Sequence, residues 1–440
     1  MKKEVRLSQC MIVKNEEKNI RRALEWGKGI MMEQIVVDTG STDRTVEIAQ
    51  ELGAQIYHYS WTGDFSAAKN YAISKANGNW IAFLDADEYF LPEDVEQLWK
   101  LLVHLERDVK PEKRPHIIRT RWANLTDQGK LFSISVQDRI FQRTPLLRYR
   151  NRIHEYIGTP PGIPVRILEK EELTILHTGY TKQAVSETNK AERNIELLKK
   201  ELEIDPENYN ALVYLGDALA LKNQIQEAME CYQEAIKHKS GKKLTAERYC
   251  VAVNSLLKIY CLVIISEQKN EIERLCDLLE ETLPGFPDTT YYHGRWLMEK
   301  GQEKEAERFF LETLERTETY RGNVLSYAST NLQDIYTRLS LIYYRNGNPD
   351  ESMRFGILSL RMNRYNQSQL NILIALFFMN AGQERQKVAE GAWEVLSKLY
   401  DVNNQKDQLF LLRAAKAVPF QEFARVVLQN LPEQDSVQMS

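Results

Sequence analysis

Three carboxylates within four positions follow a run of apolar residues in the first quarter of the chain. Residues 80–84 (WIAFL) lead directly into Asp85, Asp87 and Glu88. A continuous apolar run of this length is typical of a strand that is buried on both faces. Massed carboxylates repel one another unless a cation lies between them. In an extended segment, side chains at i and i+2 point the same way, so we expect Asp85 and Asp87 to converge on a divalent metal ion.

The segments before this run predict the sheet that must position these carboxylates. Strands are predicted at 7–13, 34–38 and 55–59, and helices are predicted at 14–26, 45–52 and 64–78. This alternation is typical of a doubly wound parallel sheet, which binds ligands outside the carboxyl ends of its strands. The polar residues that follow those strand ends are Asn15, Asp38, Ser41 and Asp85.

Further polar residues lie in a second group of predicted strands. After a helix at 92–108, alternating stretches at 116–123, 131–136, 139–142 and 173–177 predict antiparallel strands that extend the sheet. Asp138, His154, Glu155 and His177 lie in or beside them. Histidines and carboxylates in such positions can serve as a general base or as a third metal ligand.

Composition restricts the class of protein. At 440 residues the chain is long enough for two or three domains, and a net charge of -4 gives no general attraction to nucleic acid or anionic membranes. The start lacks the apolar segment of a signal peptide, and no later window is long enough to span a bilayer. The five cysteines lack metal-ligand spacing. We therefore expect reduced thiols in a cytoplasmic protein.

Four separate motifs in the first two-fifths of the chain carry a family resemblance. They are 13–17 (VKNEE), 36–43 (VVDTGSTD), 68–70 (AKN) and 84–87 (LDAD), and together they resemble the family-two glycosyltransferases of GT-A fold. The resemblance implies a Rossmann-like domain that binds a nucleotide sugar together with Mg²⁺ or Mn²⁺. One departure is Lys69, where the family commonly has Arg; the charge is kept but bidentate phosphate contact is lost.

The resemblance also implies roles for individual residues. Asp38 would contact uracil, Asn15 and Glu16 would line the nucleotide pocket, and the Asp85-Ala86-Asp87 element would hold the ribose and the metal-bound diphosphate. The full set of nucleotide-sugar-binding residues predicted here is Val13, Asn15, Glu16, Asp38, Ser41, Lys69, Asp85, Ala86, Asp87 and Arg139. The predicted metal ligands are Asp87, Asp85 and His177.

The second half of the chain predicts paired helices. Gly216 is followed at offsets of 12, 16 and 19 by Ala228, Tyr232 and Ala235, and the stretch that begins at Gly294 repeats these offsets. Small residues with an aromatic residue one turn later are typical of tetratricopeptide helix pairs, whose concave surface binds a peptide or another subunit. We therefore predict an α/β GT-A catalytic domain at 1–185 and an all-α tetratricopeptide-like domain at 186–440.

A second resemblance concerns the acceptor. His154-Glu155, His177 with Gly179-Tyr180, and 193–195 (RNI) are similar to residues of the bacteriocin peptide glycosyltransferases of the sublancin type. That resemblance implies transfer of a hexose, with glucose as the expected sugar, from a UDP-sugar to Cys or Ser of a ribosomally made peptide. The repeat domain would grip the peptide, and a homodimer is a further expectation.

The predicted reaction is a single displacement with inversion. Glu155 is the first choice for the base that takes the acceptor's proton, Asp138 the second, and His154 a further catalytic residue. Two other functions stay open, namely transfer to a cell-surface or lipid-linked polysaccharide and a non-enzymatic repeat scaffold with a nucleotide-binding domain.

Several of these residues also have a purely structural interpretation. Asp38 can cap the following helix, Lys69 can be a solvated helix lysine, and His177 can be a hydrogen-bonded structural histidine. For Asp138 the structural interpretation is favoured.

Overall fold

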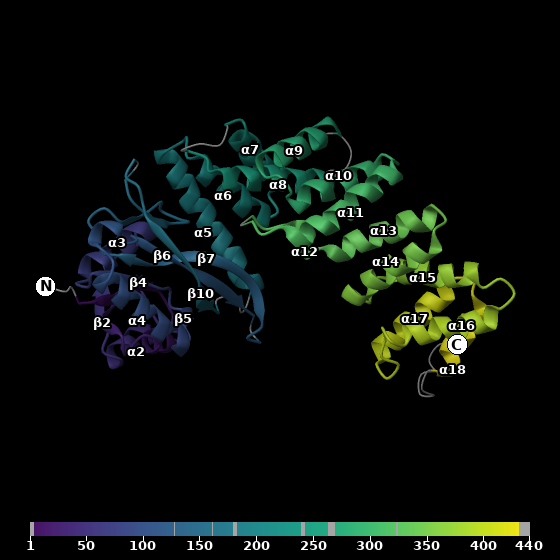
Figure 1. The fold of residues 1–440 in the computed structure, drawn as a ribbon, viewed down its shortest axis with the longest axis horizontal. Helices are drawn as coiled ribbons and strands as arrows, with labels where there is room; N and C mark the ends of the chain where they lie inside the picture. The colour runs from purple at the N-terminus through teal and green to yellow at the C-terminus, as the bar shows by residue number, and fades with distance from the viewer. Residues whose placement is uncertain are drawn as a thin grey trace. The chain divides into compact units, whose positions relative to one another are not determined.

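The computed structural model describes residues 4–126, 128–160, 162–178, 183–238, 243–262, 269–322 and 324–430. The chain divides into two compact units, the first of which extends to His238, while the second comprises the chain from Thr245 onward (Figure 1). None of the helices in these ranges combines the length and the apolar character needed to cross a membrane.

The first unit combines a sheet with helices. Its elements are β1 Leu7–Val13, α1 Ile20–Glu25, β2 Met31–Asp38, α2 Thr45–Glu51, β3 Gln55–His58, α3 Phe65–Lys75, β4 Trp80–Phe83, β5 Glu88–Phe90, α4 Pro92–Arg107, the 3₁₀ turn Pro111–Lys113, β6 Ile117–Leu125, β7 Leu131–Gln142, β8 Arg148–Arg150, β9 Tyr156–Gly158, β10 Ile167–His177, α5 Gln183–Ile204, α6 Tyr209–Leu221 and α7 Ile225–Ile236.

The sheet has eight strands in the order β3-β2-β1-β4-β7-β6-β10-β5. Strands β1 to β4 are parallel, and β7 continues the sheet antiparallel to β4 and β6. The predicted α/β fold is confirmed. The extension is only partly antiparallel as predicted, because β10 runs parallel to β6 and is antiparallel to β5. Strands β8 and β9 form a separate two-stranded sheet, which the sequence did not predict.

Strand β4 is buried on both faces because a helix covers each of them. Its even positions, Trp80 and Ala82, pack with Leu98 of α4, whereas Ile81 and Phe83 pack with helix α3 through residues such as Ala72. The predicted continuous apolar run therefore fills the centre of the sheet, and its polar continuation emerges at the carboxyl edge.

The first predicted helix begins later than its sequence indicates. It was expected at 14–26, but α1 begins only at Ile20. Asn15 adopts a left-handed backbone conformation with φ of 59°, and its amide donates to Ser41 Oγ at 3.0 Å. The chain after β1 is therefore tied to the loop after β2 before it enters the helix.

The second unit is helical throughout the parts that the structure describes. Its helices are α8 Ala246–Leu262, α9 Lys269–Thr282, α10 Pro287–Glu299, α11 Glu303–Thr319, α12 Tyr327–Thr330, α13 Leu332–Arg345, α14 Pro349–Met362, α15 Gln367–Asn380, α16 Arg385–Leu396, α17 Gln405–Ala417 and α18 Gln421–Asn430.

The predicted repeat offsets correspond to close helix crossings. A Cβ atom at Gly216 would lie 2.7 Å from the ring of Tyr232, and one at Gly294 would lie 3.1 Å from the ring of Phe310. A glycine therefore lets each aromatic ring pack against the backbone of the preceding helix. The first of these pairs, α6–α7, belongs to the first compact unit, which thus continues past the predicted boundary at residue 185.

Candidate active site

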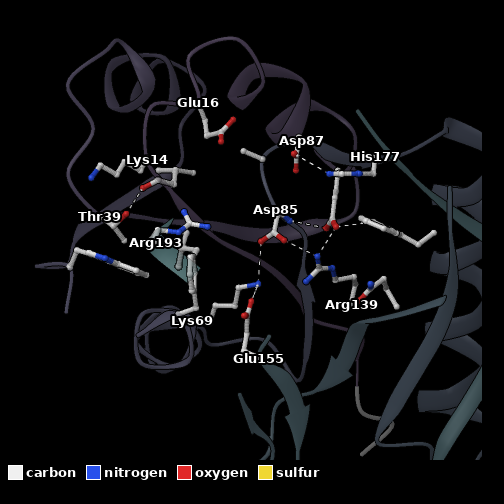
Figure 2. Close-up of a pocket in the computed structure, with 18 residues that line it drawn as sticks. Lys14, Glu16, Thr39, Lys69, Asp85, Asp87, Arg139, Glu155, His177 and Arg193 are labelled. Carbon is white, nitrogen blue, oxygen red and sulfur yellow. Dashed lines mark hydrogen bonds and ion pairs between the residues drawn. The ribbon is translucent and has the colours of Figure 1, made fainter. Parts of the chain in front are cut away.

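A cavity of about 510 Å³ lies at the carboxyl edge of the sheet (Figure 2). Its walls are formed by the ends of β1 and β4, by the residue after β2, and by side chains from α3, β7, the β8–β9 loop and α5. Its lining residues are Ile12, Val13, Lys14, Glu16, Thr39, Trp61, Phe65, Lys69, Asp85, Ala86, Asp87, Glu88, Trp122, Gln137, Arg139, Glu155, His177 and Arg193.

Five charged side chains of alternating sign form a continuous series in this cavity, part of which Figure 2 labels. Glu155 Oε1 lies 2.8 Å from Lys69 Nζ, which lies 3.2 Å from Asp85 Oδ1. The other carboxylate oxygen of Asp85 lies 2.7 Å from Arg139, which also contacts Glu88 Oε1 at 2.6 Å. We call these five residues the charge series.

The charge series overcomes the cost of burial at Asp85 and Lys69 but not at Glu88. Burial alone would raise the pKa of Asp85, but Arg139 and Lys69 hold it well below its usual range. Burial would likewise lower the pKa of Lys69, yet Asp85 and Glu155 raise it. At Glu88 burial outweighs the effect of Arg139, and the pKa of the carboxyl is raised. Lys69 and Asp85 therefore carry full charges at neutral pH.

The expectation that Asp85 and Asp87 converge on one point is wrong. The chain does not stay extended after β4, because it turns and the Glu88 amide donates to the Asp85 carbonyl at 3.0 Å. Asp85 consequently faces Lys69 and Arg139, whereas Asp87 faces His177 (Figure 2). Both oxygens of Asp85 are occupied by cationic side chains, which makes it a poor metal ligand.

Asp87 and His177 form the part of the cavity that fits a metal ion. Asp87 Oδ2 lies 3.1 Å from His177 Nε2, close to the roughly 3 Å spacing of adjacent ligands around an octahedral ion with bonds of about 2.1 Å. His177 Nδ1 lies 2.7 Å from Asn124 Oδ1, which orients the ring, and Trp122 stacks on it at 4.5 Å.

A metal ion held by Asp87 and His177 would need further ligands. Within the part of the chain that the structure describes, no group of three or more His, Cys, Asp or Glu side chains could hold a metal ion by itself. Mg²⁺ usually binds to one or two carboxylates together with substrate phosphates and waters. The donor set therefore suits an ion that arrives with a diphosphate.

The residues predicted to bind the nucleotide fall into two groups, those that line the cavity and those that do not. Val13 and Glu16 line the cavity, and burial followed by Asp87 and Asp85 raises the pKa of Glu16. Asp38 and Ser41 do not line it. Asp38 accepts hydrogen bonds from the amides of residues 40 and 41, which lower its pKa although burial acts to raise it.

The three predicted catalytic residues are not brought together. Glu155 lines the cavity, and its side chain keeps 17% of its surface exposed. Asp138 points elsewhere, in a bidentate ion pair with Arg119 at 2.8 and 2.9 Å. His154 is exposed and stacks on Tyr214 of α6. Of the three, Glu155 alone lines the cavity.

Several lining residues were not predicted as part of the site. Trp61 and Phe65 form an aromatic wall with ring centroids 4.7 Å apart, and the Arg193 guanidinium lies 5.3 Å from the Phe65 ring. Burial lowers the pKa of Arg193, although nearby Glu155 acts to raise it. Arg193 was noted only through the resemblance at 193–195, and because it belongs to α5, no strand-end pattern placed it in this cavity. Gly179-Tyr180 lie outside the described residues.

The comparisons with known proteins agree with this geometry. Residues 8–170 match the family described as Glycosyl transferase family 2. The chain carries a family 2 glycosyltransferase domain. The sequence-based predictions of a glycosyltransferase and of a GT-A-like domain followed by helices are thereby confirmed.

Relatives extend the similarity into the helical region. A TPR repeat-containing protein of Synechococcus elongatus is 28% identical over 301 residues, which are 66% of this chain and 69% of that protein. The SPbeta prophage-derived glycosyltransferase SunS of Bacillus subtilis is 27% identical over 298 residues, 67% of each protein. An uncharacterized glycosyltransferase of Rickettsia felis is 36% identical over 122 residues, 24% of this chain and 43% of that protein.

Solved structures show weaker similarity. Glucosyl-3-phosphoglycerate synthase from Mycobacterium tuberculosis, in complex with Mn²⁺, UDP and glucosyl-3-phosphoglycerate, matches with a TM-score of 0.23 and 20% identity over 27% of this chain. The match spans less than half of the synthase, 44% of its length. TarS 1–349 from S. aureus matches with a TM-score of 0.31 and 14% identity, over 72% of this chain and 93% of that one.

The charge series predicts a specific pH dependence of stability. Because the pKa of Asp85 is lowered on folding, its ion pairs stabilise the protein above the ordinary Asp pKa of about 3.9 and lose this effect as the pH falls toward the folded-state value. We expect Asp85→Asn to lower the melting temperature at pH 7. The difference in melting temperature between variant and wild type should shrink below about pH 4. Differential scanning fluorimetry from neutral to acidic pH measures this.

The control is Asp138→Asn, which removes a partly exposed ion pair with Arg119. Such pairs contribute only about 0–1 kcal/mol, so a smaller loss at pH 7 is expected. Equal losses for the two variants, or a difference for Asp85→Asn that grows in acid, would contradict the stabilising role of the charge series.

Proposed function

We propose that this cavity transfers a hexose, with glucose as the expected sugar, from a UDP-sugar to an acceptor with inversion at the anomeric carbon. The observation that carries the proposal is the meeting of two groups in one cavity. Asp87 and His177 are two neighbouring side chains that could act as metal ligands, and Glu155 is a carboxylate that can serve as a base. The family 2 match supports the reaction class.

On the donor side, Asp87 and His177 would hold Mg²⁺ or Mn²⁺. When bound, such an ion neutralises the negative charge that develops on the leaving diphosphate. Asp85 has a different role in this proposal. Lys69 and Arg139 hold its carboxylate in one position, and 35% of its side-chain surface stays exposed for contact with the ribose.

Two other cations can meet the diphosphate directly. Lys69 and Arg139 are each paired with two carboxylates, so their charge is already balanced. Lys14 and Arg193 also line the cavity, and neither forms an ion pair with a carboxylate among the described residues. We therefore assign the contribution of fixed positive charge to Lys14 and Arg193 rather than to the predicted Lys69 and Arg139.

On the acceptor side, Glu155 would remove the proton from the attacking thiol or hydroxyl group. The new bond forms between that sulfur or oxygen and the anomeric carbon while the bond from this carbon to the diphosphate breaks, and UDP leaves. The ion pair with Lys69 holds the Glu155 side chain in place. A thiol, with an ordinary pKa near 8.5, depends less on the base than a hydroxyl does.

The acceptor we propose is a Cys or Ser side chain of a ribosomally made peptide, bound with the help of the helical repeats. The resemblance to sublancin-type enzymes and the similarity to SunS across 67% of the chain support it. A cell-surface or lipid-linked polysaccharide is the alternative acceptor.

The test of donor and acceptor is mass spectrometry. The protein is incubated with Mg²⁺ or Mn²⁺, a panel of nucleotide sugars, and Cys- or Ser-containing peptides. We expect a mass gain of one hexose on a peptide with a UDP-sugar. Transfer to a polysaccharide acceptor with no peptide modified would overturn the peptide proposal, and failure to hydrolyse or transfer any nucleotide sugar would overturn the enzymatic one.

Removal of the metal-facing carboxylate separates metal binding from folding. We expect Asp87→Ala to abolish transfer and the Mn²⁺ dependence of UDP binding, while the melting temperature stays close to that of the wild type. Calorimetric titration of UDP with and without Mn²⁺ measures the second effect independently of turnover. Normal turnover, or Mn²⁺-dependent UDP binding that survives in the variant, would remove Asp87 from the proposed metal site.

Replacement of the proposed base tests the acceptor side. We expect Glu155→Gln to lower kcat by about 100-fold or more with little change in donor affinity, because the amide cannot accept the proton. Asp138→Asn is the matched control, since its carboxylate lies outside the cavity and is paired with Arg119. If Asp138→Asn lost activity and Glu155→Gln kept it, the base would be Asp138.

A further inference from the structure

We propose that Tyr214 of helix α6 is a positioning residue for the sugar-transfer reaction, because it holds the loop that delivers Glu155 to the cavity. This inference rests on the proposed role of Glu155 as the base. The loop comprises residues 151–155, between β8 and β9, and we call it the Glu155 loop.

The Glu155 loop has a backbone that its surroundings must stabilise. Asn151 and His154 both adopt the left-handed conformation, with φ of 69° and 52°. This conformation is uncommon for residues other than glycine, and it persists where neighbouring contacts determine it. The residue that follows His154 is Glu155, so the backbone conformation of His154 sets the direction in which the Glu155 side chain leaves the chain.

Helix α3 fixes the beginning of the loop. The Phe65 amide donates to the Arg152 carbonyl at 2.9 Å, and Ser66 Oγ donates to the Asn151 carbonyl at 2.5 Å. Asn70 exchanges two hydrogen bonds of 2.9 Å with the backbone of Tyr149, just before the loop. These contacts hold residues 149–152 but do not include His154.

Helix α6 holds the other end. The rings of His154 and Tyr214 are stacked, with centroids 3.6 Å apart and an angle of 7° between their planes. Helix α5 adds a contact at the beginning of the loop, where Arg152 lies 3.9 Å from Glu201. The stacked pair thus fixes the side chain that precedes Glu155, and Lys69 fixes the carboxylate itself at 2.8 Å.

This arrangement extends the functional unit beyond the family 2 domain. The family match ends at residue 170, whereas Tyr214 lies in the first helix of the repeat-like pair α6–α7. The first compact unit includes this pair, in agreement with a role in the site. Helix α6 then contributes to the reaction by orienting Glu155, in addition to any part in binding an acceptor.

Three variants of the full chain test the proposal. Tyr214→Leu removes the aromatic face, Tyr214→Phe retains it, and Tyr209→Leu is the matched control. Tyr209 lies on the same helix and forms a similar stack, at 3.8 Å and 15°, but with His238 of the chain after α7. Hydrolysis of the UDP-sugar by water gives kcat and KM without knowledge of the acceptor.

We expect Tyr214→Leu to lower kcat by about 10- to 100-fold, as for the misplacement of a catalytic group by about 1 Å, with little change in the KM for the donor. Tyr214→Phe and Tyr209→Leu should stay close to the wild type. A loss in Tyr214→Phe equal to that in Tyr214→Leu, or an equal loss in Tyr209→Leu, would overturn the positioning role of the stack.

Hydrogen exchange provides a readout that does not depend on turnover. We expect faster amide exchange in a peptide covering residues 148–158 in Tyr214→Leu, with unchanged exchange in β1 and β4. Unchanged exchange in residues 148–158 would overturn the proposal even if kcat fell.

A double variant separates this inference from the role of Glu155. If Glu155 is the base and Tyr214 acts through it, Tyr214→Leu should cause little further loss of kcat in the Glu155→Gln background. Full activity of Glu155→Gln would refute the proposed base. A large loss in Glu155→Gln with none in Tyr214→Leu would refute the positioning role alone.

Discussion

The buried ion pairs around Asp85 are the constraint on which the rest of the site depends. Lys69 joins Asp85 to Glu155, and Arg139 joins Asp85 to Glu88. Loss of one partner from the most buried of these pairs, Arg139–Glu88, leaves an uncompensated charge, at a cost of about 3–5 kcal/mol. The pairs of Asp85 itself contribute less, because 35% of its side chain is exposed to solvent. Because these residues come from α3, the β4–β5 turn, β7 and the Glu155 loop, the same interaction ties together elements that are far apart in the sequence.

Much of the scaffold could be predicted because its signals are local. The apolar run at 80–84 became β4, and the alternating stretches after residue 116 became β6, β7 and β10. The spacing from Gly216 to Tyr232 predicted a helix crossing that the structure contains. The end of β4 also identified Asp85 and Asp87 as cavity residues, because parallel strands deliver their carboxyl ends to the same edge. Asn15, Asp38 and Ser41, predicted from the neighbouring strand ends, do not line the cavity.

The partners of each charge could not be predicted in the same way. A two-residue spacing implies a shared direction only while the chain stays extended, and the turn after β4 removes that condition. Arg193 of α5 lines the cavity, and Tyr214 of α6 contacts the Glu155 loop outside it. Both helices lie beyond the family 2 match, so no nearby residue indicates their proposed roles. Asp138 is the opposite case. Its position beside a predicted strand suggested a catalytic residue, whereas its carboxylate pairs with Arg119.

The turn after β4 gives the two aspartates different electrostatic surroundings. Asp85 is held by two cations and keeps its charge without a metal ion, whereas Asp87 faces a histidine whose other nitrogen contacts Asn124. Two nearby carboxylates in unlike surroundings can take separate tasks. Under the proposed function, Asp85 can order the donor before a metal ion arrives, and Asp87 can bind the ion only together with the diphosphate. Donor and metal would then bind cooperatively, since each completes the other's ligand set.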